Sequence, residues 1–312
     1  MKLVVLIPAF NEEPNIEESV LGIPRKIMGV DKVEVLVVDD GSRDKTAELA
    51  FNAGADKVIS HKRNMGVGAA FMTGIRNAIS MNADVVVTVD ADSQFDSNQI
   101  PEIIVPILNH QSDVVIGSRF LTSRPKNIPR VKMLGNRIFS KIVSWLTGQK
   151  FTDTQTGFRA YSREALLSVS IVNDFTYTQE VLIDLKFKGL QIGEVPVSVS
   201  YDEKRKSRVV KNVFNYSSRA LSIIIRTLVY HKPIFSFGLF GAVLIGGGIL
   251  AKLLAIAEIL VVNPSLSTGF IILGAVSFMM GILASVVFKR QAFAEKDLRH
   301  YLDKSEAFKR YS

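Results

Sequence analysis

Two long uncharged apolar segments limit most strongly what this chain can fold into. Residues 234–251 and 266–288 are runs of 18 and 23 residues without a charged side chain. A helix needs about 20 predominantly apolar residues to cross the hydrocarbon core of a bilayer. A buried hairpin of a soluble domain is the alternative, but buried helices seldom run so long without a charge. The sequence therefore predicts two membrane-spanning helices.

The charges around these segments indicate how the chain is oriented. Lys289 and Arg290 follow the second segment, whereas the link 259–265 has no Lys or Arg. Residues 204–232 carry eight basic and no acidic side chains, and without them bases and acids balance at 30 each. Because basic residues favour the cytoplasmic side, we expect an integral membrane protein with its first 203 residues and both termini in the cytoplasm.

The basic segment 204–232 also bears on partners. A basic stretch can bind nucleic acid, but apolar residues alternate with the bases here and membrane spans follow. Such a segment is typical of an amphipathic element lying on anionic lipid headgroups. We therefore expect the lipid bilayer, and no nucleic acid, as a partner.

Residue usage excludes several kinds of site. The chain has no Cys, which excludes a disulfide scaffold, Cys-ligated zinc, an iron–sulfur cluster and a thiol nucleophile. With four His, a His-rich metal site is not expected. The apolar run 3–7 is too short for a signal peptide, so we expect it to be a buried strand.

The first 203 residues alternate between short β-branched runs and helical patterns. We expect strands at residues 3–7, 33–38, 57–60, 84–89 and 113–117, and helices at 13–22, 45–53, 67–81, 99–109 and 133–146. Uninterrupted apolar strands are typical of a parallel sheet that is buried on both faces. The pattern predicts an α/β domain with an open, Rossmann-like, mostly parallel sheet, which would bind its ligand beyond the carboxyl ends of the strands.

Acids, amides and glycines follow these predicted strands. The turn after the first strand contains no Gly, so the dinucleotide-binding fingerprint is absent, as is a Walker A loop. After the fourth strand comes Asp90-Ala91-Asp92, whose two carboxylates can face one hard cation such as Mg²⁺ or Mn²⁺. Such a metal completes its shell with substrate phosphates. The alternative is an Asp-rich turn with Asp92 or Ser93 as a helix cap.

Several motifs in order resemble a known family. They are Pro8-Ala9-Phe10-Asn11-Glu12, Val38-Asp39-Asp40-Gly41-Ser42, Asn64-x-Gly-x-Gly-Ala69, Asp90-Ala91-Asp92-x-Gln94, Gly117-Ser118-Arg119 and Thr156-Gly157-Phe158-Arg159. Over residues 1–205 the chain resembles family 2 inverting glycosyltransferases of the GT-A fold. It is most similar to dolichyl-phosphate mannose synthases and related polyprenyl-phosphate glycosyltransferases, and the trailing hairpin also fits that subgroup.

The resemblance implies roles for individual residues. Those implied to bind the nucleotide sugar are Pro8, Phe10, Glu12, Asp40, Asp90 and Gln94. Those implied to hold the metal are Asp90, Asp92 and Gln94, and those implied to act in catalysis are Asp92, Arg119 and Arg159. The family usually has Tyr where this chain has Phe10, so one polar contact is lost although the ring can still stack on a base.

The expected reaction is an inverting transfer of one hexose from GDP-mannose or UDP-glucose to a polyprenyl (dolichyl-type) phosphate at the cytoplasmic face. A phosphate monoester acceptor is already anionic and needs cations rather than a base. Candidates are Arg119, Arg130, Arg137, Arg205 and Arg208. One alternative is a hydroxyl acceptor with Asp153 as general base. Another is a non-catalytic membrane scaffold, against which the Asp90, Asp92 and Gln94 set argues.

The sequence thus predicts four regions. They are a GT-A domain at 1–203, a basic amphipathic juxtamembrane segment at 204–232, two transmembrane helices at 233–290 and a cytoplasmic tail at 291–312. The sugar, the nucleotide base, the preferred metal, the type of polyprenol and the oligomeric state stay open.

Overall fold

The computed structural model describes residues 1–122, 128, 130–169, 177–199, 225–226, 228–257 and 263–311, with side chains except those of 130–132 and 291–311. The chain divides into two compact units, Met1–Arg208 and Val209–Ser312. Most of the basic segment 204–232 lies outside the described residues, and so do Arg205 and Arg208.

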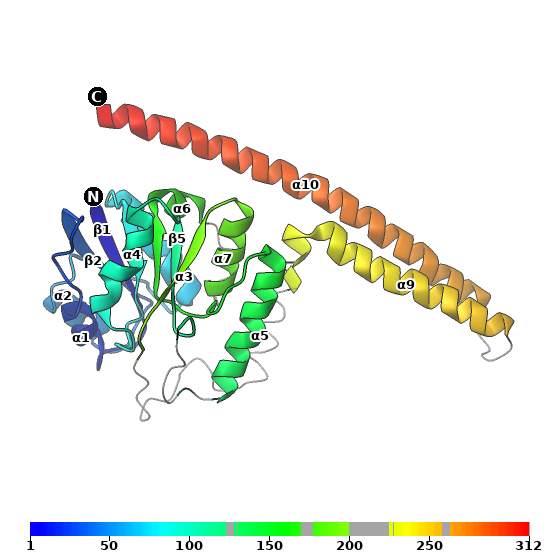
Figure 1. Cartoon of the computed structure of the whole chain (residues 1–312), viewed down its shortest axis with the longest axis horizontal. Coiled ribbons are helices and arrows are strands. Elements are labelled where there is room, and N and C mark those ends of the chain that lie inside the picture. Colours follow the sequence, from blue (N-terminus) through cyan, green and yellow to red (C-terminus); the bar gives the residue numbers. More distant parts are fainter. Residues whose placement is uncertain are drawn as a thin grey trace. The chain divides into compact units, whose positions relative to one another are not determined.

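A single sheet organises the first unit (Figure 1). In the described residues it has seven strands in the order β3-β2-β1-β4-β6-β5-β7. Their bounds are β1 Lys2–Ala9, β2 Lys32–Asp39, β3 Lys57–Ser60, β4 Val85–Thr88, β5 Val114–Ser118, β6 Arg159–Ser162 and β7 Ile192–Pro196. All neighbours pair in parallel except β6, which is antiparallel to both β4 and β5. The predicted open, mostly parallel sheet is confirmed.

The five predicted strands are all present, within two residues of the expected bounds. The sequence analysis missed β6 and β7. The first is four residues long and begins with a charged residue, and the second contains Gly193 and Pro196, which are unusual inside strands. Both depend on pairing with β5 rather than on a strong local preference.

Helices cover both faces of the sheet. Their bounds in the first unit are α1 Ile16–Leu21, α2 Thr46–Asn52, α3 Val67–Ser80, α4 Ile100–Leu108, α5 Arg130–Thr147, α6 Arg163–Ser168 and α7 Thr178–Phe187, with a short 3₁₀ turn η1 at Ser97–Gln99. Odd-numbered residues of β1, β2 and β4 form one core with Ile16, Val20 and Ile103. On the opposite face α3 packs on β1 and β2, where Gly74 lies against the side chain of Leu6.

The second unit contains two long apolar helices, α9 (Pro233–Ile256) and α10 (Pro264–Tyr311). Within Pro233–Ile256 and Pro264–Arg290, an 18-residue window reaches a mean hydropathy of 2.2 and 2.5, and only 11% and 17% of these windows are buried in the protein. Both are long and apolar enough to cross a membrane, as the sequence predicts. Figure 1 shows α10 continuing past the portion that lies beside α9.

Small residues bring α9 and α10 together. A β-carbon added to Gly241 would lie 2.6 Å from the carbonyl oxygen of Gly274, and one added to Gly274 would lie 2.6 Å from that of Gly241. The Ser277 hydroxyl donates a hydrogen bond to the carbonyl oxygen of Phe237 at 2.9 Å. Small interfacial residues and a polar bond are the usual means of pairing helices in lipid, where burial of apolar surface gives no driving force.

Candidate active site

Several of the predicted site residues lie at the carboxyl ends of neighbouring strands. Strands β2, β1 and β4 are adjacent and parallel, so the residues that follow them meet at one edge of the sheet. The backbone N–H of Asp40 donates to the carbonyl oxygen of Ala9 at 2.8 Å, which extends the pairing beyond the strands. The structure thereby brings Pro8, Asp40 and Asp90 to one edge.

The turn after β1 is held by side chains of the turn after β2. The backbone N–H of Asn11 donates to the Ser42 hydroxyl and that of Glu12 to the Thr46 hydroxyl, both at 2.9 Å. The Glu12 carboxylate accepts a hydrogen bond from the Asn15 amide at 2.7 Å. These contacts fix Glu12, while the ring of Phe10 is 39% exposed and can meet a ligand.

The turn that carries Asp90 and Asp92 is tied to α1. The buried Ser19 hydroxyl donates to the carbonyl oxygen of Ala91 at 3.0 Å and lies 2.8 Å from the Ser93 hydroxyl. The backbone N–H of Gln94 donates to Oδ1 of Asp92 at 3.1 Å. These bonds fix the backbone from which both carboxylates project.

Asp90 is half-buried and lies against Gly157. A β-carbon at residue 157 would lie 2.9 Å from Oδ2 of Asp90. Burial, followed by repulsion from the Asp92 carboxylate, raises the pKa of Asp90 to about 7. Attraction to Arg119 and Arg159 opposes this shift.

Two neighbouring carboxylates with an amide two residues on suit a hard divalent cation that keeps waters or substrate phosphates as further ligands. Within the described residues no group of three or more His, Cys, Asp or Glu side chains forms a complete metal cage. Asp90, Asp92 and Gln94 fit a cation that depends on the substrate for the rest of its shell. Burial is the main cause of the raised pKa of Asp90, and repulsion from Asp92 is the second; a bound cation would offset both.

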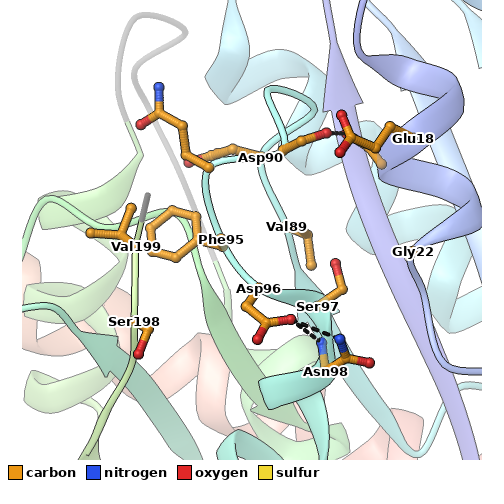
Figure 2. A pocket seen from close by; sticks show the side chains of 13 residues that line it. Glu18, Gly22, Val89, Asp90, Phe95, Asp96, Ser97, Asn98, Ser198 and Val199 are labelled. Atoms are coloured by element: carbon orange, nitrogen blue, oxygen red, sulfur yellow. Dashed lines mark hydrogen bonds between the residues drawn. The ribbon is translucent and has the colours of Figure 1, made fainter. Parts of the chain in front are cut away.

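A cavity of about 550 Å³ lies under this turn. Figure 2 shows Phe95 and Val199 side by side on one wall and α1, with Glu18 and Gly22, on the other. Phe95 and Val199 are joined by an antiparallel bridge. Asp90 and Gln94 line the same cavity, so it is continuous with the carboxylate turn.

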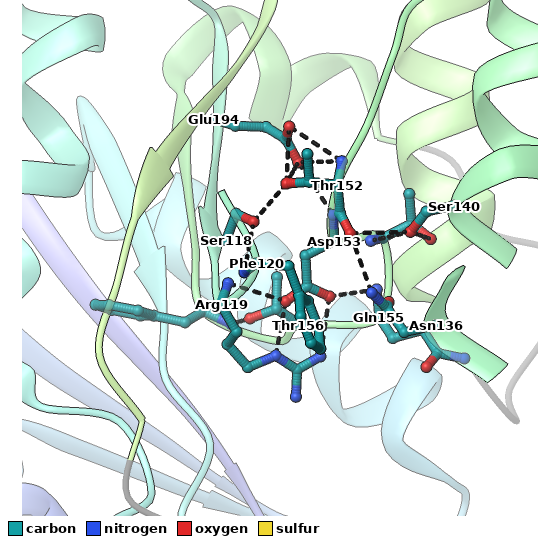
Figure 3. Close-up of polar contacts among 12 residues, drawn as sticks. Ser118, Arg119, Phe120, Asn136, Ser140, Thr152, Asp153, Gln155, Thr156 and Glu194 are labelled. Carbon is teal, nitrogen blue, oxygen red and sulfur yellow. Dashed lines mark hydrogen bonds and ion pairs between the residues drawn. The ribbon is translucent and has the colours of Figure 1, made fainter. Parts of the chain in front are cut away.

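Arg119, directly after β5, is held by Asp153 (Figure 3). The Nε of Arg119 donates to Oδ2 of Asp153 at 2.6 Å and its terminal nitrogen donates to Oδ1 at 2.9 Å. The Asp153 side chain is fully buried, whereas that of Arg119 is 15% exposed. The carboxylate considered as a general base is thus committed to a two-point ion pair that orients a cation.

A polar network that the sequence did not reveal fixes the backbone around Asp153 (Figure 3). The Glu194 carboxylate of β7 accepts hydrogen bonds from the backbone N–H of Thr152 at 2.9 Å and of Asp153 at 3.2 Å. The Thr152 hydroxyl lies 2.6 Å from that of Ser118, and Asn136 of α5 donates to the carbonyl oxygen of Thr152 at 3.0 Å. Burial raises the pKa of Glu194.

Arg159 is fully buried on β6. Its guanidinium donates to the carbonyl oxygens of Thr154, at 2.9 Å, and of Thr178. The side chain therefore braces the segment that carries Asp153 against α7, and its charge acts on Asp90 from inside the protein. Its predicted part in catalysis stays a prediction.

A second cavity, of about 460 Å³, opens beside this network and is basic. Its charged lining residues are Arg137, Lys141 and Lys150, and Phe120 and Thr152 link it to the Arg119 region. Lys141 and Lys150 were not predicted; their spacing from Arg137 along α5 and the following loop was the available signal. Arg130 begins α5, and its side chain is not described.

The first unit of this protein combines an open, mostly parallel α/β sheet with paired carboxylates after its fourth strand. This combination is typical of GT-A-like nucleotide-sugar transferase domains, and we place the protein in that class. The chain belongs to glycosyl transferase family 2, whose sequence model matches residues 4–169, more than half of its length. This confirms the family that the motifs predicted.

The chain is also similar in sequence to proteins of known name. The chain is 34% identical over 226 residues to the UDP-N-acetylglucosamine–dolichyl-phosphate N-acetylglucosaminyltransferase of Methanococcus voltae, covering 66% of this chain and 88% of that protein. It is 34% identical over 195 residues to the dolichyl-phosphate hexose transferase of Haloferax volcanii, covering 62% and 81%. These names support the predicted polyprenyl-phosphate subgroup.

Solved structures share the fold. Glucosyl-3-phosphoglycerate synthase of Mycobacterium tuberculosis, solved with UDP, superposes with a TM-score of 0.56 at 24% identity, covering 73% of this chain and 79% of that one. At this identity the likeness establishes the GT-A-like fold alone.

Proposed function

We propose that the protein transfers one sugar from a nucleoside diphosphate sugar to a polyprenyl phosphate. The observation that carries this proposal is the two-point ion pair between Arg119 and the buried Asp153. A hydroxyl acceptor needs a base that is free to take a proton, and a carboxylate paired with Arg119 is poorly suited to that. A phosphate acceptor needs only to be held and aimed.

The chemistry is one displacement. An oxygen of the acceptor phosphate attacks the anomeric carbon of the sugar, the bond from that carbon to the diphosphate breaks, and the configuration inverts. Negative charge grows on the leaving diphosphate, and Arg119 at the same edge of the sheet can stabilise it. Because the nucleophile is already an anion, no proton has to be removed.

Asp90, Asp92 and Gln94 would hold Mg²⁺ or Mn²⁺, and that cation would neutralise charge on the leaving diphosphate. The Asp90 carboxylate lies against Gly157, and the hydrogen bond from Ser19 to the carbonyl oxygen of Ala91 holds the turn that carries it. A solved structure of the same fold, the glucosyl-3-phosphoglycerate synthase of Mycobacterium tuberculosis, contains Mn²⁺ with UDP-glucose, which supports the use of a divalent cation.

The basic cavity is our candidate for the acceptor phosphate. Arg137, Lys141 and Lys150 line it, next to Phe120 and so beside Arg119. Arg130, Arg205 and Arg208 remain proposals for the same ligand. Nucleotide contacts are proposed for Pro8, Phe10, Glu12 and Asp40.

The membrane would supply the lipid acceptor. We propose that α9 and α10 span the bilayer, that residues 204–232 lie at its surface, and that residues 1–203 and 291–312 are cytoplasmic, because Lys289, Arg290 and the basic segment favour that side. A phosphate on an isoprenoid chain lies at headgroup level, where a domain tethered in this way can reach it.

The test is a radiolabel assay on the full chain in detergent with Mg²⁺ or Mn²⁺. GDP-mannose, UDP-glucose and UDP-N-acetylglucosamine are offered in turn with polyprenyl phosphate or the matching polyprenol. We expect a mild-acid-labile glycolipid from the phosphate alone, abolished by EDTA and by Asp92→Asn. A product made from the polyprenol would instead indicate a hydroxyl acceptor. No product with any donor would contradict an enzymatic role.

A further inference from the structure

The carboxylate of Asp40 lies where three elements meet. It follows β2, is 3% exposed, and its oxygens accept hydrogen bonds from backbone N–H groups of the turn that leads from β3 to α3. Met65 donates to Oδ1 at 2.9 Å and Gly66 donates to Oδ2 at 2.8 Å. The Asp40 carboxylate therefore fixes the backbone of this turn, in addition to any contact that it makes with a ligand.

His61 braces that carboxylate. Its Nδ1 lies 2.7 Å from Oδ1 of Asp40, and its Nε2 lies 2.9 Å from the Thr73 hydroxyl of α3. Because an ionised carboxylate only accepts, Nδ1 is the donor to Asp40, while Nε2 lies within hydrogen-bonding distance of the Thr73 hydroxyl. The backbone N–H of His61 donates to the carbonyl oxygen of Asp39 at 2.9 Å. The ring is thus fixed at both nitrogens and through its backbone.

The turn 64–66, which Asp40 holds, includes a residue with a backbone conformation that few residue types adopt. Gly66 adopts φ 99°, in the region that favours glycine, and it is the N-cap residue directly before α3. As the N-cap, Gly66 provides no side-chain hydrogen bond to the first turn of α3. The turn also packs closely on Gly41, since a β-carbon there would lie 2.8 Å from the backbone nitrogen of Asn64.

The outer side of the turn is available to a ligand. The side chains of Met65 and Val67 are 51% and 43% exposed, and Asn64 is also exposed. The turn follows β3, so it lies at the same edge of the sheet as Asp40 and Glu12. The first N–H groups of a helix are, in addition, favourable neighbours of phosphates.

We infer that His61 is a positioning residue for the nucleotide-sugar donor. It holds the Asp40 carboxylate against the backbone of Met65 and Gly66, and so sets the turn 64–66 and the start of α3 for the nucleotide. Thr73 fixes the other side of the ring. This inference rests on the proposed function, because it takes a nucleotide sugar to be the ligand of this edge.

The test measures donor and acceptor separately. His61→Ala should raise the Kd for UDP or GDP, by calorimetry with Mn²⁺, and the donor KM, each about tenfold, because one bond to a charged group is lost. The kcat at saturating substrates and the acceptor KM should stay close to those of wild type. His61→Asn, whose amide can replace Nδ1 as a donor, should recover most of the affinity.

Two further measurements separate positioning from general stability. Amide hydrogen exchange at Met65 and Gly66 should speed up in His61→Ala while the β1 amides keep their protection. Thr73→Val should weaken nucleotide binding less than His61→Ala does. Ser80→Ala is the control, because that hydroxyl bonds only to Arg76 within α3.

Each outcome has one meaning. A wild-type donor KM in His61→Ala overturns the inference, as does an equal rise in donor and acceptor KM together with a lower Tm. If His61→Ala does not fold, Thr73→Val decides, and unchanged nucleotide affinity with unchanged exchange at Met65 and Gly66 overturns it. A wild-type chain that binds no nucleotide contradicts the proposed function instead.

Discussion

Gly157 lies directly against the carboxylate of Asp90 at the edge of the sheet. A β-carbon on any other residue at position 157 would collide with that carboxylate. The backbone around residue 157 is fixed, because its carbonyl oxygen accepts a hydrogen bond from the buried Thr88 hydroxyl. A side chain at this position therefore displaces Asp90 rather than the backbone.

We accordingly predict that Gly157→Ala lowers turnover about 100-fold, as expected when a reacting group shifts by about 1 Å. The activation by added Mn²⁺ should require higher metal concentrations. The measurement is a metal titration of the transferase assay. Gly135→Ala in α5 is the matched control, since nothing lies within 4 Å of a β-carbon there. Equal metal dependence in the two variants would contradict the prediction.

Asp153→Asn should destabilise the fold and disable the enzyme. Removing one partner of a buried ion pair costs about 3–5 kcal/mol, and Asp153 is fully buried against Arg119. Denaturant unfolding and the polyprenyl-phosphate assay check the two effects. Arg119→Lys keeps a charge but loses the two-point geometry, so it should be more stable than Asp153→Asn yet similarly slow. A folded Asp153→Asn variant with the wild-type rate would show that the pair does not position Arg119.

Glu194 should make the stability depend on pH. Burial raises its folded pKa above the unfolded value, so the folded state holds this proton more tightly. Wild type should therefore lose stability relative to Glu194→Gln as the pH rises from the unfolded pKa through the folded one. Thermal unfolding of both proteins across that acidic range measures the difference. If the difference in Tm between wild type and Glu194→Gln stays constant with pH, or changes in the opposite direction, the pKa of Glu194 is not raised in the folded state.

The basic cavity should act on the acceptor alone. Arg137→Gln and Lys141→Gln each remove one cation from its lining, and we expect the KM for polyprenyl phosphate to rise about tenfold, the usual effect of one charged hydrogen bond. Nucleotide affinity should not change. Lys26→Gln, an exposed lysine outside the cavity, controls for the loss of charge. If all three variants share the wild-type acceptor KM, the phosphate binds elsewhere.

The close contact between Gly241 and Gly274 predicts a packing defect in the hairpin. Gly274→Leu forces α9 and α10 apart, because its β-carbon alone would lie 2.6 Å from the carbonyl oxygen of Gly241. The detergent-solubilised variant should unfold at a lower temperature than wild type. Gly269→Leu is the control, since no atom lies within 4 Å of a β-carbon there. Similar Tm values for both variants would mean that this contact adds little.

The sequence was informative where chemistry follows a strand directly. Asp40 and Arg119 come immediately after a buried strand, and Asp90 comes two residues after one. Strands β2 and β4 both pair in parallel with β1, which is enough to place Asp40 and Asp90 at one edge of the sheet. The two long apolar helices were predictable for a simpler reason, since length and apolarity are themselves the signal.

The sequence was uninformative where a contact joins distant segments. Glu194 lies 42 residues from Thr152 and is brought to it by a short strand with no local signal of its own. Likewise, the motif around Arg159 predicted a part in catalysis, which stays a prediction, but it did not indicate that β6 buries this side chain inside the fold. Tertiary pairing, rather than local preference, decides both positions.

Helix α10 has 48 residues without a break. At 1.5 Å per residue it measures about 72 Å, more than twice the thickness of a hydrocarbon core. If α10 crosses the bilayer as proposed, a sideways displacement of its far end tilts the portion within the lipid, together with the α9 helix that packs on it through Gly241 and Gly274.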